Sequence, residues 1–324
     1  MRKLVFIVLG AVFVILGYFT VISAGKAFRS DWQLPPRSDQ ADSAYRIVLF
    51  TQELVTPFWD KVGAGALEQA DKEGARLEVW GSYGKNQVDF LKKVELAIHS
   101  RVDGIIVQGL DTDEFKQLTK IKAAFYGIPI ITVANDVPMA ESLRRTYVGS
   151  DQYKAGRMIA AQLLDDMGTS GHVVLMSDDH HEYYQKRRIA GIEDVLNDYP
   201  DIHIVYAETP AAREHVIATT RDVMNRFPRM DAFVAVNANL AGAIIQEIGR
   251  RTRVEPYHIY SFDDGSESLT LLMEGKLDGM IGQAPEMMGK ISVSSIMRWL
   301  TGDTVPLDIN GYLTDIRMLK ATDL

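Results

Sequence analysis

Residues 46–80 read RIVLFTQELVTPFWDKVGAGALEQADKEGARLEVW, and this stretch decides the fold. It opens with Ile47–Phe50, a short apolar run typical of a buried strand. Thr56 and Pro57 then supply an N-cap and a proline at the first helical position, and apolar residues follow at helical spacing. Gly74 is placed to end that helix before a second strand. The stretch is one βαβ unit and predicts a parallel sheet.

The same alternation of strand and helix patterns continues to the end of the chain and predicts an α/β fold. We expect four strands in a first lobe, at residues 47–50, 77–80, 104–107 and 128–133. A second series is expected at residues 172–176, 202–206, 232–236, 258–262 and 279–281. The body from about residue 45 exceeds the usual size of one hydrophobic core, which also favours two lobes.

The N-terminal residues 1–24 predict a membrane anchor. Leu4–Ala24 carries no charge, and a helix of that length at ~1.5 Å per residue matches the ~30 Å hydrocarbon core of a bilayer. Arg2 and Lys3 favour a cytoplasmic N-terminus, with the body outside the cytoplasm. The alternative is a cleaved signal peptide, because residues 23–25 are small. Residues 25–44, rich in proline, serine and aspartate, are expected to form a stem.

Composition disfavours several classes of function. The chain has no cysteine, which removes disulfides, thiolate nucleophiles and a lipidated cysteine anchor. A net charge of −8 gives no general attraction to nucleic acid. Neither a glycine-rich nucleotide loop nor a Gly-x-Ser-x-Gly elbow is present, so we expect neither an enzyme nor a bound cofactor.

Aromatic, amide and carboxylate side chains follow the predicted strands. Ligands of open parallel sheets bind outside the carboxyl ends of the strands. These positions hold Thr56–Trp59, Gln108–Gly109, Asn135–Asp136, Asn237, Phe262–Asp263 and Gln283. Aromatic faces pack on the apolar faces of a sugar ring, while amides and carboxylates bind hydroxyl groups, so the set suits a polyol. The alternative for each residue is a structural role, such as closing a turn.

The segment Asp178–Glu182 contains adjacent carboxylates and histidines, which are competent metal ligands. Adjacent histidines in one loop do not easily point at a single ion without distant partners. We therefore expect no metal site here.

Several segments together resemble the type I periplasmic binding proteins, and among them the ribose-binding and related sugar-binding members. They are Thr56–Trp59, Val102–Val107, Gly127–Thr132, Val148–Asp151, Ser261–Asp263, Gly275–Leu277 and Gly282–Pro285. The resemblance implies two doubly wound parallel-sheet lobes joined by a three-strand hinge, closing over a small ligand. It implies a first lobe of residues 45–150 plus 284–312, and a second of 151–283 plus 313–324.

The resemblance also implies which residues contact the ligand. Phe58, Trp59 and Gln108 match first-lobe contacts, and Arg188 matches a second-lobe arginine. Second-lobe and hinge contacts fall on Asn237, Phe262, Asp263 and Gln283.

The sequence departs from the family pattern at three places, one of which is Ala238, which follows Asn237 where an acid is usual. Ala134 stands where an acid is expected, so Asn135 and Asp136 are expected to replace the contacts after that strand. Arg213 aligns near an expected aromatic residue. Arg188 and Arg213 would suit an anionic sugar and Asp136 and Asp263 would oppose it, so we expect a neutral sugar ahead of an anionic one.

Two roles remain open for such a body. One is delivery of a carbohydrate to an ABC transporter permease, and the other is reporting of a carbohydrate to a membrane histidine kinase. The related transcription regulators carry a helix-turn-helix where this chain has its apolar segment, so DNA binding is not expected.

Overall fold

The computed structural model of the chain describes residues 15–20, 44–54, 56–82, 86–180, 182–250, 257–262 and 266–323. The chain divides into two units, residues 1–44 and 45–324. In the first unit, residues 15–20 are helical. Within the described ranges, no helix has both the length and the apolar character needed to cross a membrane. The remainder of the predicted anchor, and the predicted stem up to residue 43, lie outside the described residues.

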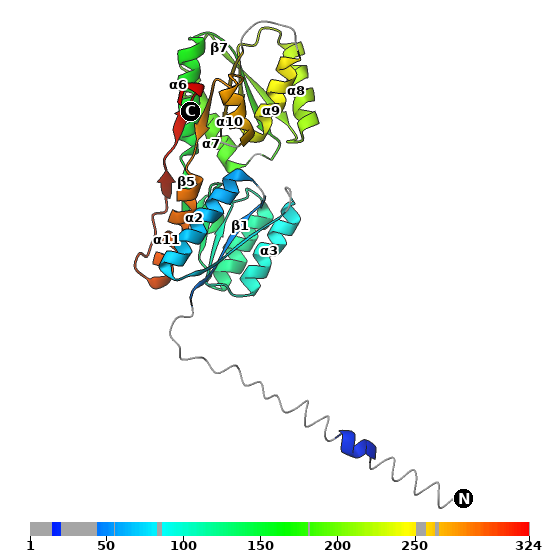
Figure 1. Ribbon diagram of the computed structural model, residues 1–324, viewed down its shortest axis with the longest axis vertical. Coiled ribbons are helices and arrows are strands. Elements are labelled where there is room, and N and C mark those ends of the chain that lie inside the picture. Colours follow the sequence, from blue (N-terminus) through cyan, green and yellow to red (C-terminus); the bar gives the residue numbers. More distant parts are fainter. Residues whose placement is uncertain are drawn as a thin grey trace, which may run out of the picture. The chain divides into compact units, whose positions relative to one another are not determined.

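The first lobe of the body is built on a six-stranded sheet in the order β11-β5-β4-β3-β1-β2, with all neighbours parallel (Figure 1). Its strands are β1 (Arg46–Thr51), β2 (Arg76–Gly81), β3 (Gly104–Val107), β4 (Ile130–Val133), β5 (Thr146–Ser150) and β11 (Tyr312–Thr314). Its helices are α2 (Pro57–Glu73), α3 (Gln87–His99), α4 (Asp113–Gln117), the π-helix η1 (Leu118–Ala123), α5 (Met139–Ser142) and α11 (Pro285–Thr301).

The second lobe repeats this plan with the strand order β12-β10-β9-β8-β6-β7, and only its edge strand β12 is antiparallel. Its strands are β6 (Gly171–Asp178), β7 (Ile202–Thr209), β8 (Ala232–Ala235), β9 (His258–Phe262), β10 (Gly279–Gly282) and β12 (Arg317–Leu319). Its helices are α6 (Gln152–Met167), α7 (Tyr183–Leu196), α8 (Arg213–Arg226), α9 (Ala238–Gly249), α10 (Ser266–Met273) and the short 3₁₀-helix η2 (Ala321–Asp323).

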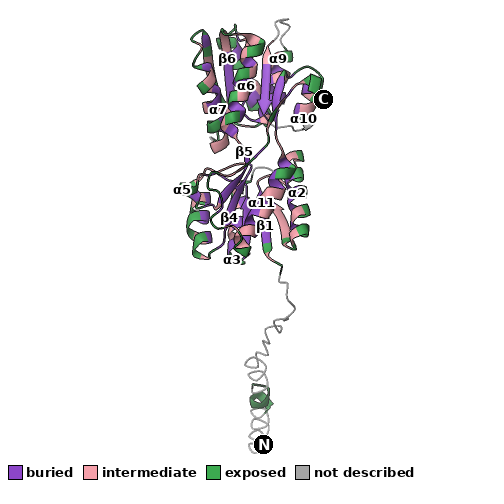
Figure 2. Cartoon of the chain, turned by 90° about the vertical axis from the view of Figure 1, so that its left-hand side faces the viewer, coloured by how far each residue is buried: buried purple, intermediate pink, exposed green. Residues whose placement is uncertain are grey.

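Alternation along the central strands places one core on each face of each sheet. In β1, Ile47 and Leu49 pack with α2 and α11, whereas Val48 and Phe50 pack with α3 and α4. The second lobe has the same arrangement around β6, and in Figure 2 the strands of both sheets are buried between helices. The α/β fold class predicted from the sequence is therefore confirmed.

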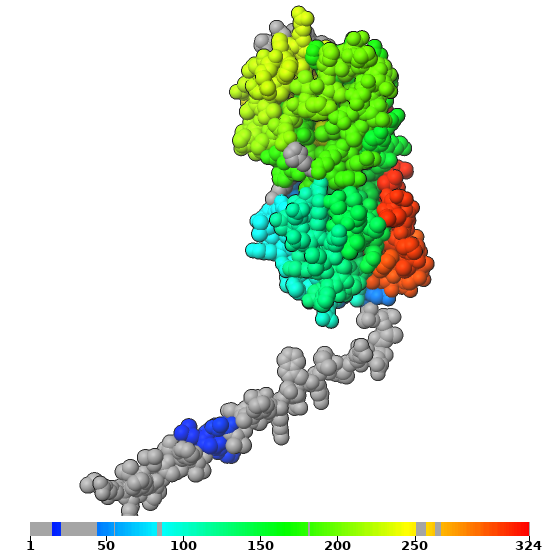
Figure 3. All heavy atoms as spheres, turned by 180° about the vertical axis from the view of Figure 1, so that it is seen from behind, coloured from blue at the N-terminus to red at the C-terminus, as the bar shows by residue number. Residues whose placement is uncertain are grey.

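The chain passes between the two sheets three times: after β5, after β10, and between β11 and β12. Figure 3 shows part of the result, because orange residues from late in the chain lie on the lobe that the earlier cyan residues build. The prediction of four first-lobe strands is wrong, since β5 and the three-residue β11 complete that sheet. β11 pairs with β5 as far as Thr314, and β12 begins at Arg317.

Helices α6 and α7 approach each other through two glycines. A Cβ atom at Gly156 would lie 2.1 Å from the carbonyl oxygen of Arg188, and one at Gly191 would lie 2.1 Å from that of Tyr153. Only glycine permits such contact between backbones. The position of Arg188, a predicted site residue, therefore depends on this packing.

We predict that Gly156→Ala destabilises the protein, because the added methyl group overpacks the α6–α7 contact at a cost of about 1–3 kcal/mol. The measurement is the thermal unfolding midpoint, which should fall by several degrees. Gly249→Ala at the end of α9 is the matched control, since no atom lies within 4 Å of a Cβ there. Equal midpoints for both variants would contradict the close approach.

Candidate ligand-binding site

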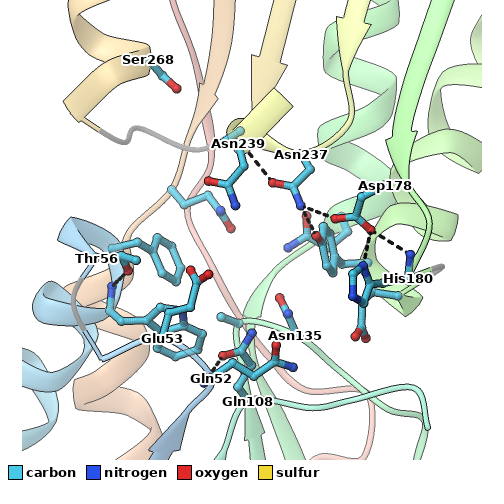
Figure 4. Close-up of a pocket in the computed structure, with 18 of the residues that line it drawn as sticks. Gln52, Glu53, Thr56, Gln108, Asn135, Asp178, His180, Asn237, Asn239 and Ser268 are labelled. Carbon is cyan, nitrogen blue, oxygen red and sulfur yellow. Dashed lines mark hydrogen bonds and ion pairs between the residues drawn. The ribbon is translucent and has the colours of Figure 1, made fainter. Parts of the chain in front are cut away.

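A cavity of about 290 Å³ lies between the two lobes, where the carboxyl ends of strands from both sheets meet (Figure 4). Loops and helix starts from each lobe contribute to its lining. Seven of the residues predicted from the sequence are among those that line it: Phe58, Trp59, Gln108, Asn135, Arg188, Asn237 and Gln283.

The first-lobe aromatic pair is held by the start of α2. The hydroxyl of Thr56 accepts a hydrogen bond from the backbone N–H of Trp59 at 3.3 Å, and Pro57 occupies the first helical position. The Phe58 and Trp59 rings pack edge to face with centroids 5.4 Å apart. Two aromatic rings therefore face the cavity in positions that the helix cap fixes.

Gln108, directly after β3, presents a donor to the cavity. Its side-chain oxygen accepts hydrogen bonds from the Thr51 hydroxyl at 3.2 Å and from the Gln52 backbone N–H at 2.9 Å. These bonds orient the carboxamide, and the Gln108 side chain is nearly buried. The amide nitrogen makes no hydrogen bond within the described part of the chain and is available to a ligand oxygen.

A tight turn after β4 selects which side chain enters the cavity. Ala134 has a φ of 62°, and the backbone N–H of Asn135 donates back to the Val133 carbonyl at 2.7 Å. This is a γ-turn with positive φ, a rare and strained geometry for a non-glycine residue. The buried Tyr147 hydroxyl, 3.0 Å from the Ala134 carbonyl oxygen, holds the turn, and burial raises the pKa of that hydroxyl. The turn leaves Asn135 on the cavity.

Asp136, expected as a ligand contact, takes a structural role instead. Its carboxylate accepts hydrogen bonds from the Arg144 guanidinium at 2.6 and 2.8 Å and from the Thr132 hydroxyl at 2.6 Å. Arg144 also donates to the Ile309 carbonyl at 2.9 Å, so the ion pair joins two loops of the first lobe. The one-residue turn at Ala134 directs Asp136 to this pair and away from the cavity lining.

Arg188 is the central cation on the second-lobe side. Its side chain is 2% exposed, and its guanidinium carbon lies 4.8 Å from the Tyr184 ring centroid and 4.2 Å from that of Phe262. It donates to the Gln152 side-chain oxygen and to the Val236 carbonyl, each at 2.8 Å. The expected contact Phe262 is thus fully buried behind Arg188 and is not among the described residues that line the cavity.

Asn237 lies at the cavity but uses both ends of its carboxamide on protein groups. Its oxygen accepts from the Asn239 backbone N–H at 3.1 Å and caps α9, as Figure 4 shows. Its nitrogen donates to Asp178 at 2.8 Å and to the Tyr184 hydroxyl at 2.9 Å. Asn237 therefore positions its neighbours.

Gln283 lies at the second crossing between the lobes. Its side-chain oxygen accepts a short hydrogen bond from the Ser150 hydroxyl at the end of β5, which precedes the first crossing. The bond joins two of the three crossing segments directly beside the cavity.

Two other predicted residues, Arg213 and Asp263, are not among the described residues that line the cavity. The half-exposed side chain of Arg213 binds Gln246 of α9 at 2.9 Å and Glu267 of α10 at 3.2 Å. Asp263 lies outside the described residues.

Sequence reasoning missed several residues that line the cavity: Gln52, Glu53, Gln152, Asp178, Tyr184, Asn239 and Glu267. A positional signal existed for most of them. Gln52 and Glu53 directly follow β1, Asp178 ends β6, and Asn239 lies in the first turn of α9, all at the carboxyl side of a sheet.

The possible metal ligands Asp178, Asp179 and His180 bring ligand atoms within 4.8 Å of one another. Asp178 is already committed, because its oxygens accept from Gln185 at 2.6 Å and from Asn237 at 2.8 Å. The remaining histidine of this run, His181, lies outside the described residues. The cluster stabilises the end of β6 through hydrogen bonds within the lobe.

A charged contact joins the two lobes. Asp111 of the first lobe binds Lys186 of α7 at 2.7 Å and Lys116 of its own lobe at 2.7 Å. The backbone N–H of Asp111 also donates to the second-lobe Glu182 carboxylate at 3.2 Å. Burial alone would raise the pKa of Asp111, but the hydrogen bonds from Lys116 and Lys186 outweigh it and lower the pKa.

Two doubly wound lobes with a cavity at their facing strand ends define a two-lobed binding protein. The model of the periplasmic binding protein domain family matches residues 47–304, and the chain belongs to this family.

Individual relatives and structures agree with this assignment. The ribose import binding protein RbsB of Bacillus subtilis is 21% identical over 87% of this chain and 90% of its own length. The glucose-galactose binding protein GanP of Geobacillus stearothermophilus superimposes with a TM-score of 0.80 at 26% identity, covering 87% of this chain and 99% of GanP. A chain of the XylFII–LytSN complex gives a TM-score of 0.76 at 25% identity, covering 87% and 100% of the two chains.

We predict that Lys186→Met shifts the protein toward separated lobes, because separation breaks the ion pair with Asp111. A partly exposed pair contributes about 0.2–1 kcal/mol, so the ratio of open to closed forms should rise by up to about fivefold. Small-angle X-ray scattering measures this as a larger radius of gyration. Lys276→Met is the matched control, because Lys276 is equally exposed and pairs with Glu274 inside one lobe.

The same contact has a defined pH dependence. Asp111 has a lowered pKa in the folded state, so its stabilising contribution is present above its unfolded pKa and is lost as the pH falls through the lowered value. An ordinary Asp pKa is about 3.9, so Asp111, whose pKa is lowered, stays ionised between pH 5 and 8. The difference in radius of gyration between Lys186→Met and Lys276→Met should therefore stay constant over this pH range. Identical scattering from Lys186→Met and its control would show that the contact does not hold the lobes together.

Proposed function

We propose that this protein binds a small carbohydrate outside the cytoplasm and closes its two lobes over it, as a binding protein and not as an enzyme. The observation that carries the proposal is the cavity of about 290 Å³ between the lobes, with two aromatic rings on one side and amides on both. That volume is at the small end of the ~300–1,000 Å³ range of ligand pockets and suits a monosaccharide. The sugar-binding names of RbsB and GanP support this choice.

The lining favours a neutral ligand over an anionic one. Arg213 is engaged with Glu267, and the guanidinium of Arg188 already donates to Gln152 and to a backbone carbonyl. The cavity also contains the carboxylates of Glu53 and Glu182. A sugar acid or phosphosugar would meet this negative charge, whereas hydroxyl groups can donate to it.

The proposed mechanism is ligand-stabilised closure. Phe58, Trp59 and Gln108 would contact the sugar from the first lobe, and Arg188 with its neighbours from the second. Because only the closed form makes both sets of contacts, a bound sugar favours that form. By the family resemblance we also propose Asp263, directly after β9, as a contact for sugar hydroxyls.

We propose lobe boundaries of residues 45–150 plus 284–314 and 151–283 plus 315–324. We further propose that residues 1–24 form a retained membrane helix with residues 25–44 as a stem. In the cell, the protein would serve a sugar ABC transporter as its substrate-binding component, which the import role in the name of RbsB supports.

The alternative role is a membrane-anchored sugar sensor that signals to a histidine kinase. The similarity to a chain of the XylFII–LytSN complex favours the sensor role, because that chain of the same fold occurs in a complex with another protein. Deleting the gene separates the two roles. Loss of uptake of the labelled sugar supports transport, whereas intact uptake with loss of a sugar-induced transcriptional response supports sensing.

We predict that one or more neutral pentoses or hexoses raise the unfolding temperature of the full 324-residue chain, whereas sugar acids and phosphosugars do not. Ligand at ~1,000 times its dissociation constant contributes about 4 kcal/mol, which is several degrees. A folded sample that responds to no carbohydrate would contradict the proposed function.

We also predict that Asn135→Ala weakens binding of that sugar about tenfold without lowering the unfolding temperature of the free protein. The Asn135 side chain lines the cavity and makes no hydrogen bond within the described residues, so its loss removes a ligand contact only. Titration calorimetry measures the affinity. Asn310→Ala, at an exposed position of the first lobe, is the control and should bind as the native protein does.

A further inference from the structure

The charges of the cavity are unevenly balanced. Its described lining contains four carboxylates, those of Glu53, Asp178, Glu182 and Glu267, and one guanidinium, that of Arg188. A neutral sugar does not need this excess of negative charge. The partners of each carboxylate show which of them is available to a ligand.

Three of the four carboxylates are engaged by protein groups. Asp178 accepts from Gln185 and Asn237, and Glu182 accepts from the backbone N–H of Asp111. Glu267 pairs with Arg213 at 3.2 Å. These carboxylates hold the second lobe together or join it to the first.

Glu53 differs from the other three. Its backbone is fixed after β1, because its N–H donates to the Thr51 hydroxyl, which also lies 3.3 Å from the Glu53 carbonyl oxygen. Its carboxylate forms no hydrogen bond or ion pair with any residue that the structure describes. Figure 4 shows this carboxylate directed into the cavity from the first lobe. Glu53 therefore presents a full negative charge to whatever the cavity holds.

Closure of the lobes removes water from this carboxylate, and an uncompensated buried charge is costly. A hydroxyl group supplies one O–H donor, whereas an ammonium group supplies three N–H donors and a compensating charge. The Phe58 and Trp59 rings line the same side of the cavity, and aromatic faces also attract cations. Carboxylate and rings together suit a protonated amine attached to a small ring.

We propose that the ligand is an amino sugar or amino polyol, and that Glu53 recognises its protonated amine. This inference rests on the proposed function, since it assumes a small polyhydroxy ligand in this cavity. It makes Glu53 the residue that discriminates between an amine and a hydroxyl at one ring position. The amides of Gln108 and Asn135 would then bind the remaining hydroxyl groups.

The experiment compares ligands that differ in one group, using titration calorimetry on the full chain. The pairs are D-glucosamine with D-glucose, D-galactosamine with D-galactose and D-mannosamine with D-mannose, and each N-acetyl derivative tests the amine without its charge.

We expect at least one amine to bind ten times more tightly than its hydroxyl parent and its N-acetyl derivative. Glu53→Gln should reduce that preference to less than threefold. Glu114→Gln, an exposed first-lobe glutamate outside the cavity lining, should keep it.

The outcomes separate this inference from the proposed function. Binding of a hydroxyl parent with no preference for its amine, or an amine preference that survives Glu53→Gln, would overturn the role of Glu53 and leave carbohydrate binding in place. Failure of every amine and every parent to bind a folded protein would overturn both proposals. Unfolding temperatures of the free variants show whether each is folded.

Discussion

The arrangement of the site depends on one constraint, namely that the chain passes between two parallel sheets three times. The carboxyl ends of the strands are thereby directed toward one another across a cavity, and the loops that follow them become its walls. Each crossing is short, so few backbone torsions need to change for the lobes to move. The hydrogen bond between Ser150 and Gln283 joins two crossings beside the cavity, and the contact from Asp111 to Lys186 joins the two lobes.

The polar groups around the cavity fall into two kinds. Arg188 and Asn237 hydrogen-bond to protein groups, and these bonds fix α7, α9 and the ends of β6 and β8 in relation to one another. Gln108, Asn135 and Glu53 keep donors or acceptors that no described protein group uses. All three of these residues belong to the first lobe.

The sequence predicted the fold class because buried strands and helix caps are local signals. Thr56 and Pro57 begin α2 as their residue types require, and the strand ends identify Gln108 and Asn237 as cavity residues. The strands β11 and β12 were missed because three-residue strands carry almost no pattern.

The absence of Asp136 and Arg213 from the described lining has a different origin. A turn at Ala134 directs Asp136 to Arg144, and an ion pair joins Arg213 to Glu267. Both outcomes depend on partners that are distant in sequence. Glu53 was missed because it belongs to no motif, although it lies three residues after the predicted strand 47–50. Its importance follows from the absence of a described protein partner for its carboxylate.

The most direct test of lobe closure is a distance measurement between the lobes. The chain contains no cysteine, so two introduced cysteines, at the exposed Glu114 and Asp198, would carry a fluorescent donor and acceptor specifically. Single-molecule energy transfer is then recorded with and without a sugar that raises the unfolding temperature. The account predicts that the sugar converts a broad distance distribution into one narrow population at the shorter distance. An unchanged distribution in the presence of a sugar that binds would contradict it.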